Sequence, residues 1–349
     1  MNEKTISTTN MKKPLLGKTL GELKTLVAEY KMPGFTAKQI SQWLYQKRVG
    51  SIEEMTNLSK KHRELLSADY EVGLTAPADA ATSVDGTIKY LFRTQTEKLI
   101  ESVYIPDGER ATLCVSSQMG CKMNCLFCMT GKQGFNGNLT SHEIMNQIQS
   151  IPQNDKLTNI VFMGMGEPMD NVDELFKVLE ILTADWGYAW SPKRITVSTI
   201  GLLKHLKRFL DESSCHLAIS LHSPFPEERL KIMPVEKAWP MKDLLDLLRQ
   251  YDFSKQRRLS FEYIMFNGFN DTKRHAQELL HILKGIDCRM NLIRFHAIPN
   301  VDLKTSNEQV MNNFRDYLND RGLTCTIRSS RGEDIFAACG MLSTLKSKK

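Results

Sequence analysis

The chain has 349 residues, of which 41% are hydrophobic and 25% are charged, a composition typical of a globular protein with one large domain and a small one. The first twenty residues contain no apolar signal-peptide core, and no stretch reaches the roughly 18 consecutive apolar residues of a membrane span, so we expect a cytoplasmic protein without a membrane partner. Because cytoplasmic thiols stay reduced, the eight cysteines favour metal binding or catalysis over a structural disulfide framework.

The net charge of +6 is concentrated near the start of the chain. Residues 1–67 contain twelve Lys and Arg against six Asp and Glu, so the remaining chain is balanced. A basic excess confined to one end suggests a surface that meets a polyanion such as nucleic acid. A well-solvated helical face would carry the same charges, so charge alone leaves both interpretations open.

Two short segments precede the main body of the chain. From Thr19 to about Leu66 the apolar residues recur at helical spacing, which predicts a small helical module within residues 1–84. The runs "GTIKYLFRT" and "KLIESVYIP" then alternate like strands, with Asp85-Gly86 as a turn signal before the first of them. Residues 85–106 are therefore expected to form a connecting β-hairpin.

Residues 107–335 show six strand-then-helix units. The apolar, β-branched runs that predict the strands are 111–117, 159–164, 194–199, 216–221, 259–266 and 289–295. Amphipathic helical segments lie near 141–149, 172–184, 202–210, 241–251, 273–284 and 307–320, and a last strand is expected at 323–330. Right-handed crossovers make such strands parallel, so we expect an α/β fold: a partial TIM-like (βα)6 barrel, followed by a loop and tail at 336–349.

The motifs that carry chemistry follow the predicted strands, at the end of the barrel where active sites lie. After the first strand, Cys121, Cys125 and Cys128 form C-x3-C-x2-C, with Phe127 just before the last cysteine. Three thiolates can hold three irons of a [4Fe–4S] cluster and leave the fourth iron open for a ligand. This spacing resembles the signature of the radical S-adenosylmethionine (SAM) superfamily; the alternatives are a Cys3His zinc site with His142, or thiols without a metal.

The run "FMGMGEPM" ends the second strand with two glycines and an acid. The glycines would let a ligand approach the backbone, and Glu167 could accept hydrogen bonds from its ammonium group, as in the GGE-type loop of the superfamily that it resembles. The run lacks the third glycine of a nucleotide-binding fingerprint, which excludes a Rossmann site. Ser198, Ser220 and His222 follow later strands, where they could bind the cofactor or be ordinary capping and core residues.

Two further cysteines lie at opposite ends of the ladder. Cys114 belongs to the first strand and Cys339 follows the last one, so a closed barrel would bring the two thiols together beside the cluster. Free cysteines are also common core residues, which is the interpretation we adopt for Cys215, Cys288 and Cys325.

Motifs over nearly the whole chain resemble the bacterial adenine-C2 methyltransferases of 23S ribosomal RNA and tRNA. They are "ESVYIPDGERATLCVSSQMGC", "CLFCMTGKQGF", "FMGMGEPMDN", "VSTIG", "SLHSP" and "IRSSRGEDIFAACG". A related family methylates adenine C8 at the same ribosomal site and confers antibiotic resistance, and "IPDGERATLC" is more similar to the C2 enzymes.

The resemblance implies a mechanism and its residues. Cys339 would take a methyl group from one SAM and become S-methylcysteine, while a second SAM, bound to the one cluster of the chain, would give a 5′-deoxyadenosyl radical. That radical would remove a hydrogen from the methyl group, and the resulting carbon radical would add to C2 of the adenine. Glu101 would then remove the C2 proton, and Cys114 would attack the Cys339 sulfur and leave a disulfide. The implied SAM contacts are Gly166, Glu167, Ser198, Ser220, Leu221, His222 and His296.

The resemblance also implies the partners: 23S rRNA at the peptidyl transferase centre, the tRNA anticodon loop, and an external one-electron donor such as flavodoxin, with the enzyme expected to be a monomer. A stacked base cannot reach a buried cluster, so we expect a single-stranded or flipped adenosine, gripped by phosphate contacts from the basic module and the barrel rim. Where the family usually reads "NLIPWNP", this chain reads "NLIRFHA", which places His296 at a cofactor-contacting asparagine. An imidazole can also donate to a ribose or an adenine.

Three rival functions remain to be tested. A radical enzyme acting on a peptide or a small molecule would explain the three cysteines, but neither the basic N-terminal region nor Cys339. An iron–sulfur electron carrier normally uses four clustered cysteines. An RNA-binding scaffold would have no use for a dedicated thiol pair.

Overall fold

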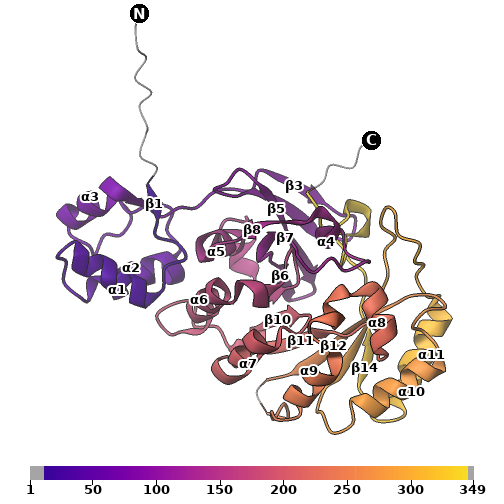
Figure 1. Ribbon diagram of the computed structural model, residues 1–349. Helices are drawn as coiled ribbons and strands as arrows, with labels where there is room; N and C mark the ends of the chain where they lie inside the picture. The colour runs from indigo at the N-terminus through magenta and orange to yellow at the C-terminus, as the bar shows by residue number, and fades with distance from the viewer. Residues whose placement is uncertain (1–11, 256, 345–349) are drawn as a thin grey trace, which may run out of the picture.

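The computed structural model describes residues 12–255 and 257–344, which form a small helical module beside a larger α/β body (Figure 1). Residues 1–11 and 345–349, at the outer ends of the predicted ranges 1–84 and 336–349, lie outside the described residues. Within the described ranges, no helix combines the length and the apolar character needed to cross a membrane.

The front module contains the helices that the spacing of apolar residues predicts. They are α1 (Leu20–Glu29), α2 (Thr36–Ser41), the π-helix η1 (Gln42–Lys47), which continues α2, and α3 (Lys60–Asp69). Two short parallel strands, β1 (Lys13–Pro14) and β2 (Tyr70–Glu71), tie its ends together. Thr19 caps α1 in a reciprocal capping box with Glu22. The helices bury Leu23, Leu26, Val27, Ile40 and Leu44 between them.

The body is built on one ten-stranded sheet in the order β14-β13-β12-β11-β10-β9-β6-β5-β4-β3. Its parallel strands are β6 (Arg110–Cys114), β9 (Asn159–Phe162), β10 (Ile195–Thr199), β11 (His216–Ser220), β12 (Leu259–Met265), β13 (Arg289–Arg294) and β14 (Cys325–Ile327). The antiparallel strands are β3 (Asp79–Thr82), β4 (Ile88–Arg93) and β5 (Leu99–Asp107). Each predicted barrel strand corresponds to one parallel strand, which confirms the partial barrel.

The long helices pack outside the parallel strands, as predicted (Figure 1). They are α5 (Ser141–Gln149), α6 (Val172–Thr183), α7 (Leu203–Glu212), α9 (Met241–Leu248), α10 (Lys273–Ile282) and α11 (Glu308–Asn319). The short helices are α4 (Met129–Gln133), α8 (Pro226–Ile232) and the 3-10 turns η2 (Asn154–Lys156), η3 (Pro168–Asn171), η4 (Pro192–Arg194), η5 (Pro234–Lys237) and η6 (Glu333–Ile335). A separate hairpin, β7 (Gln118–Gly120) with β8 (Phe135–Asn138), flanks the cysteine loop.

The predicted hairpin is an extension of the barrel sheet. Strands β4 and β5 pair antiparallel as expected, and β5 also pairs with β6, the first barrel strand. The structure adds β3, which lies within the range 1–84 and pairs with β4. The helical part of that range therefore ends at β2, and the following residues belong to the sheet.

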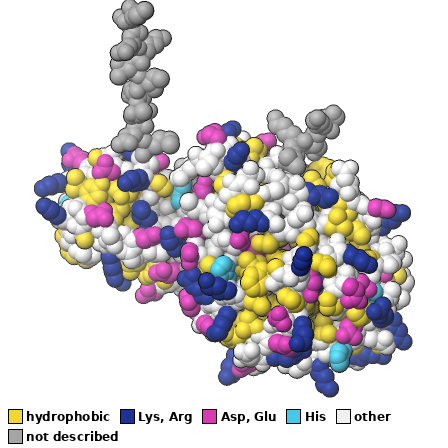
Figure 2. All heavy atoms as spheres, viewed as in Figure 1, with side chains coloured by type: hydrophobic (Ala, Val, Ile, Leu, Met, Phe, Trp, Pro, Cys, Tyr) yellow, Lys and Arg dark blue, Asp and Glu magenta, His cyan; other side chains and the backbone are white. Residues whose placement is uncertain are grey.

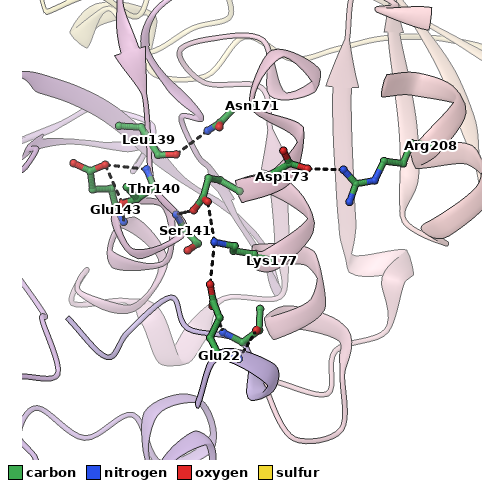
Figure 3. Close-up of polar contacts among 11 residues, drawn as sticks. Glu22, Leu139, Thr140, Ser141, Glu143, Asn171, Asp173, Lys177 and Arg208 are labelled. Atoms are coloured by element: carbon green, nitrogen blue, oxygen red, sulfur yellow. Dashed lines mark hydrogen bonds and ion pairs between the residues drawn. The ribbon is translucent and has the colours of Figure 1, made fainter. Parts of the chain in front are cut away.

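Ion pairs join the front module to the outside of the barrel (Figure 3). The Lys177 ammonium lies 3.0 Å from a carboxylate oxygen of Glu22 in α1 and 3.0 Å from one of Glu174 in α6. Further along the contact, Gln46 donates to the carbonyl of Asp185 and Arg48 to the carbonyl of Asn154. The module thus lies along α5 and α6, with η1 close to the connections that lead into β9 and β10.

A buried arginine ties the strand ends that form the mouth of the barrel. Arg229 of α8 donates to the carbonyls of Ile200, Ser220 and Leu221, which follow or end β10 and β11. Its remaining guanidinium nitrogen pairs with Glu236, and both side chains are almost completely buried. This pair fixes the position of two loops that line the mouth.

We expect Arg229→Met to lower the free energy of unfolding by about 3–5 kcal/mol, because it leaves the Glu236 carboxylate buried without its partner. Arg208→Met is the matched control, because Arg208 pairs with Asp173 (Figure 3) and the Asp173 side chain is exposed. This variant should lower the free energy of unfolding by about 1 kcal/mol or less. Urea denaturation followed by tryptophan fluorescence measures both. Equal midpoints for the two variants would contradict this role of Arg229.

Candidate active site

The cysteine loop runs between β7 and α4 and is fixed by its own backbone. The Cys121 amide donates to the Gly134 carbonyl at 3.0 Å, and the Cys128 amide to the Cys125 carbonyl at 3.1 Å. Gly120 has φ +85°, and a Cβ there would lie 1.7 Å from the Gly134 oxygen, so only glycine fits. The chain can then turn tightly enough to bring all three cysteines to one side.

The thiols of Cys121, Cys125 and Cys128 line a single cavity of about 150 Å³, which we call the thiol cavity. Among the residues that the structure describes, no three His, Cys, Asp or Glu side chains lie close enough together to hold a single metal ion. His142 bonds instead to the Gly73 carbonyl and to Gln95, so it does not complete a Cys3His zinc site.

Three thiols around one cavity fit the iron–sulfur cluster that the motif predicts. Burial raises the pKa of Cys121 to about 12 and that of Cys125 well above its ordinary value. Soft thiolates favour iron–sulfur clusters, and coordination deprotonates a thiol that burial otherwise keeps neutral. Phe127 closes the cavity on one side, with its ring 4.8 Å from the His222 ring in an edge-on contact.

The "GMGEP" run forms another part of the wall of the thiol cavity. A Cβ at Gly164 would lie 2.6 Å from the Val115 carbonyl oxygen, and one at Gly166, where φ is +99°, would lie 2.5 Å from Gln118. Both glycines are therefore needed for the loop to pack against the segment after β6. The buried Glu167 carboxylate accepts hydrogen bonds from the amides of Met169 and Ile200, each at 3.0 Å, and burial raises its pKa to about 7.

The other predicted cofactor residues occupy different positions. Ser198, Ser220 and His222 line the thiol cavity. The Nδ1 of His222 accepts from the Ile264 amide at 3.0 Å, and burial lowers the pKa of this histidine to about 3, so the ring stays neutral. The Leu221 side chain is fully buried in the core and lines neither cavity described here. His296 lies between Ser330 and Glu333, and it lines a second cavity.

This second cavity has a volume of about 590 Å³ and is lined by five arginines, so we call it the arginine cavity. Met163, Ile293, Arg328 and Cys339 line both cavities and thus form the wall between them. Cys339 is exposed, because both cavities reach it. The protein atoms packed around its thiol raise its pKa, while the Arg328 guanidinium lowers it.

Cys114 is buried next to Cys339, as the barrel topology predicts. Burial raises the pKa of the Cys114 thiol to about 12, and the neighbouring Cys339 contributes to this increase. All eight cysteines are free in the structure. The structure therefore brings the two thiols together without a bond between them.

Glu101 lies on β5 beneath the C-terminal segment. One carboxylate oxygen lies 3.0 Å from the Lys89 ammonium, and the other accepts from the Ser343 amide at 2.9 Å. Burial raises its pKa, and Lys89 opposes this increase. The side chain lines neither cavity, so the segment that contains Cys339 separates it from solvent.

Sequence reasoning missed a charged pair beside the Cys339 thiol. Arg328 lies 3.2 Å from an oxygen of Glu262, which also accepts hydrogen bonds from Ser260 and Asn291. The other Glu262 oxygen is buried and has no hydrogen-bond partner among the described residues. An acid within a predicted core strand and an arginine within "IRSSRG" were the available signals, because neither residue type is common in a barrel interior.

Comparisons with known proteins agree with this geometry. The family model for the radical SAM superfamily matches residues 115–280, and that for the ribosomal RNA large subunit methyltransferase N-terminal domain matches residues 13–72. The chain is 63% identical over 338 residues to a protein of Bacteroides fragilis named probable dual-specificity RNA methyltransferase RlmN, covering 97% of this chain and 98% of that protein. A protein of the same name from Parabacteroides distasonis is 64% identical over 336 residues, covering 96% and 98%.

A solved structure has the same fold over almost the full length. The crystal structure of a radical SAM methyltransferase from Sphaerobacter thermophilus superposes with a TM-score of 0.88 at 36% identity, covering 94% of this chain and 98% of that one. The match includes the front module as well as the barrel, since 94% coverage leaves no room to omit either. Within the radical SAM superfamily, the chain belongs to the RlmN family of dual-specificity RNA methyltransferases.

Proposed function

We propose that this RNA methyltransferase transfers a methyl group to C2 of an adenosine in 23S rRNA, at the peptidyl transferase centre, and in the tRNA anticodon loop. The observation that carries the proposal is the position of Cys339: an accessible thiol in the wall between the thiol cavity and the arginine cavity, with Cys114 beside it. A thiol with access from two sides can meet a methyl donor on one side and a base on the other.

We infer that Cys121, Cys125 and Cys128 hold one [4Fe–4S] cluster per chain. When bound, the cluster would supply the electron for the reductive cleavage of SAM. An external donor such as flavodoxin would then return an electron to the cluster. Gly166, Glu167, Ser198, Ser220 and His222 are positioned around the thiol cavity to bind SAM, and Leu221 would contribute through its backbone. His296 would contact the cofactor only if SAM extends past the wall into the arginine cavity.

Cys339 has to act as the methyl carrier because direct transfer lacks a nucleophile. Adenine C2 lies between two ring nitrogens and is electron-poor, as is the sulfonium methyl group of SAM. A thiolate can attack the methyl group of a first SAM to give S-methylcysteine and S-adenosylhomocysteine. Burial raises the pKa of the Cys339 thiol, and the positive charge of Arg328 opposes this increase, so Arg328 favours the thiolate that the step requires.

Release of the product requires a base and a second thiol. Removal of a hydrogen from the S-methyl group, with consumption of a second SAM, leaves a carbon radical that bonds to C2. The adduct radical must then give one electron to a one-electron acceptor, such as the oxidised form of the external donor, before a closed-shell intermediate is reached. Glu101, whose pKa burial raises, is suited to accept the C2 proton once the covering segment moves. The Cys114 thiolate then attacks the Cys339 sulfur, the carbon–sulfur bond breaks, the methyl carbon takes a proton, and a disulfide remains to be reduced.

The domain organisation fits a monomeric cytoplasmic enzyme that brings RNA to a buried site. In this proposal residues 1–84 contact RNA, 85–106 connect, 107–335 form the catalytic barrel and 336–349 carry the methylated cysteine. The alternatives are methylation of C8, which would use the same thiols, and a radical reaction on a non-RNA substrate.

Incubation of the cluster-reconstituted protein with SAM, a reductant, and 23S rRNA or tRNA should give 2-methyladenosine, detected by nucleoside mass spectrometry. Cys339→Ala should reduce it to background, because no methyl carrier remains, while Cys215→Ala, a buried thiol away from both cavities, should not. An 8-methyladenosine product would replace the C2 assignment. Formation of 5′-deoxyadenosine without any RNA product would reject the RNA substrate.

Cys114→Ala should trap the enzyme on its RNA, because nothing then breaks the bond between the Cys339 methylene and the base. We expect a protein–RNA adduct that survives denaturing electrophoresis, with turnover reduced to background. The adduct should disappear in the double variant Cys114→Ala/Cys339→Ala. Multiple turnovers by Cys114→Ala would show that another group resolves the intermediate.

A further inference from the structure

The arginine cavity opens at the end of the barrel opposite the cysteine loop. Arg110 is the first residue of β6, Arg289 is the first residue of β13, and Arg258 directly precedes β12. These strands belong to the parallel part of the sheet, so their N-terminal ends lie on the same side. We call these three residues the arginine cluster; they converge on one opening although they are up to 179 positions apart in sequence.

Positive charge in this cavity is not neutralised by the protein. The lining contains five arginines and one acid, Asp107. Arg331 pairs with Asp107 and Arg328 with Glu262. Among the residues that the structure describes, no member of the arginine cluster has an ion-pair partner.

The positive charges of the arginine cluster also repel one another. Partial burial and the positive charges of Arg289 and Arg110 lower the pKa of Arg258. The adjacent His216 accepts a hydrogen bond from the Arg258 amide, and burial together with Arg258 lowers its pKa to about 4, so it adds no charge at neutral pH. Like charges held together in a concave surface attract anions, because nearby low-dielectric walls concentrate the field.

The cavity leads directly to the reactive thiol. Its volume of about 590 Å³ lies within the range of ligand sites, roughly 300–1,000 Å³. At its inner end Cys339 and Arg328 form part of the wall shared with the thiol cavity. A group that enters from the arginine cluster would therefore meet the thiol from the side opposite the cofactor residues.

We propose that a single-stranded segment of the target RNA enters the barrel through the arginine cavity, with backbone phosphates next to the target adenosine bound by Arg110, Arg258 and Arg289. The base then reaches Cys339 from the N-terminal ends of the strands. The identity of the polyanion as RNA rests on the proposed function. Guanidinium groups suit this role because they bind phosphate oxygens in pairs, and phosphate contacts fix the position of a strand without reading its sequence.

The front module reaches this end of the barrel with η1 and Arg48, whereas its Gly17 packs against His142 at the start of α5. Its contacts with the carbonyls of Asn154 and Asp185 involve the connections that lead into β9 and β10, next to the N-terminal ends of these strands. Figure 2 shows both Lys and Arg and Asp and Glu side chains on the visible face of the module. Its exposed residues include the ion pair of Lys60 and Glu64.

The test compares Arg110→Gln/Arg258→Gln/Arg289→Gln with the unaltered protein in fluorescence anisotropy, using a labelled tRNA anticodon stem–loop over a range of salt concentrations. If three phosphate contacts are lost, the slope of log affinity against log salt should fall by about 2, since each single-strand contact contributes roughly 0.7. The matched control, Lys207→Gln/Lys242→Gln/Lys273→Gln, removes three exposed charges from the outer helices α7, α9 and α10 and should leave the slope unchanged.

Two further measurements separate the possible failures. SAM-dependent methylation of Cys339, measured by protein mass spectrometry, needs no RNA and should proceed in the glutamine variant at the rate of the unaltered protein, which shows that the fold is intact. The lysine variant Arg110→Lys/Arg258→Lys/Arg289→Lys keeps the charge and should restore most of the slope. An unchanged slope and affinity in the glutamine variant, while the unaltered protein methylates RNA, would overturn the arginine cluster alone. Absence of RNA methylation by the unaltered protein would overturn the proposed function.

Discussion

The active site depends on the contact between the C-terminal segment and the β3–β5 extension of the sheet. Asp85 accepts a hydrogen bond from the Gly332 amide at 3.0 Å, and Arg331 lies 3.0 Å from Asp107. Burial alone would raise the pKa of Asp85, but the Gly332 and Thr87 hydrogen bonds hold it well below its usual range. The ionised Asp85 carboxylate thus helps to join the C-terminal segment to the β3–β5 extension, where the partial barrel would otherwise be open. On the other side of Cys339 the segment is held by the Met129 amide, which donates to the Gly340 carbonyl at 2.8 Å, and by the Ser343 amide, which donates to Glu101.

Closure of the barrel also explains the electrostatics around the two thiols. Arg328 follows β14, the last strand, whereas Cys114 ends β6, the first parallel strand. Their proximity lets one guanidinium lower the pKa of both Cys114 and Cys339. Glu262 holds Arg328 in place, and its second, unpartnered oxygen keeps a buried acceptor near the thiol cavity. A closed eight-stranded barrel would fill this space with apolar side chains instead.

The sequence predicted the barrel strands and the cysteine motif, but it did not predict which side chains meet inside the barrel. The seven parallel strands of the large sheet were predictable because a series of continuous apolar runs separated by amphipathic helices is typical of parallel α/β folds. Strands β3, β7 and β8 were missed because they are three or four residues long, and α8 because prolines flank it on both sides. The pair of Arg328 and Glu262 and the arginine cluster join residues that are distant in sequence. Only the curvature of the sheet brings them together, and periodicity carries no information about it.

In the proposed mechanism Cys339 reacts with two partners that differ in size and charge, and the two cavities offer a separate route to each. A small cofactor fits a cavity with glycine walls and a buried carboxylate, whereas a polyanionic strand needs a wide opening with unpaired arginines. Because methylation of Cys339 needs no RNA, the first SAM can be replaced by the second before the RNA binds, and separate routes also leave this exchange open afterwards. A thiol in a thin wall between two openings lets the cofactor exchange while the base stays bound. Cys114 needs access to neither cavity, because its only partner is the Cys339 sulfur, and its burial is consistent with that single task.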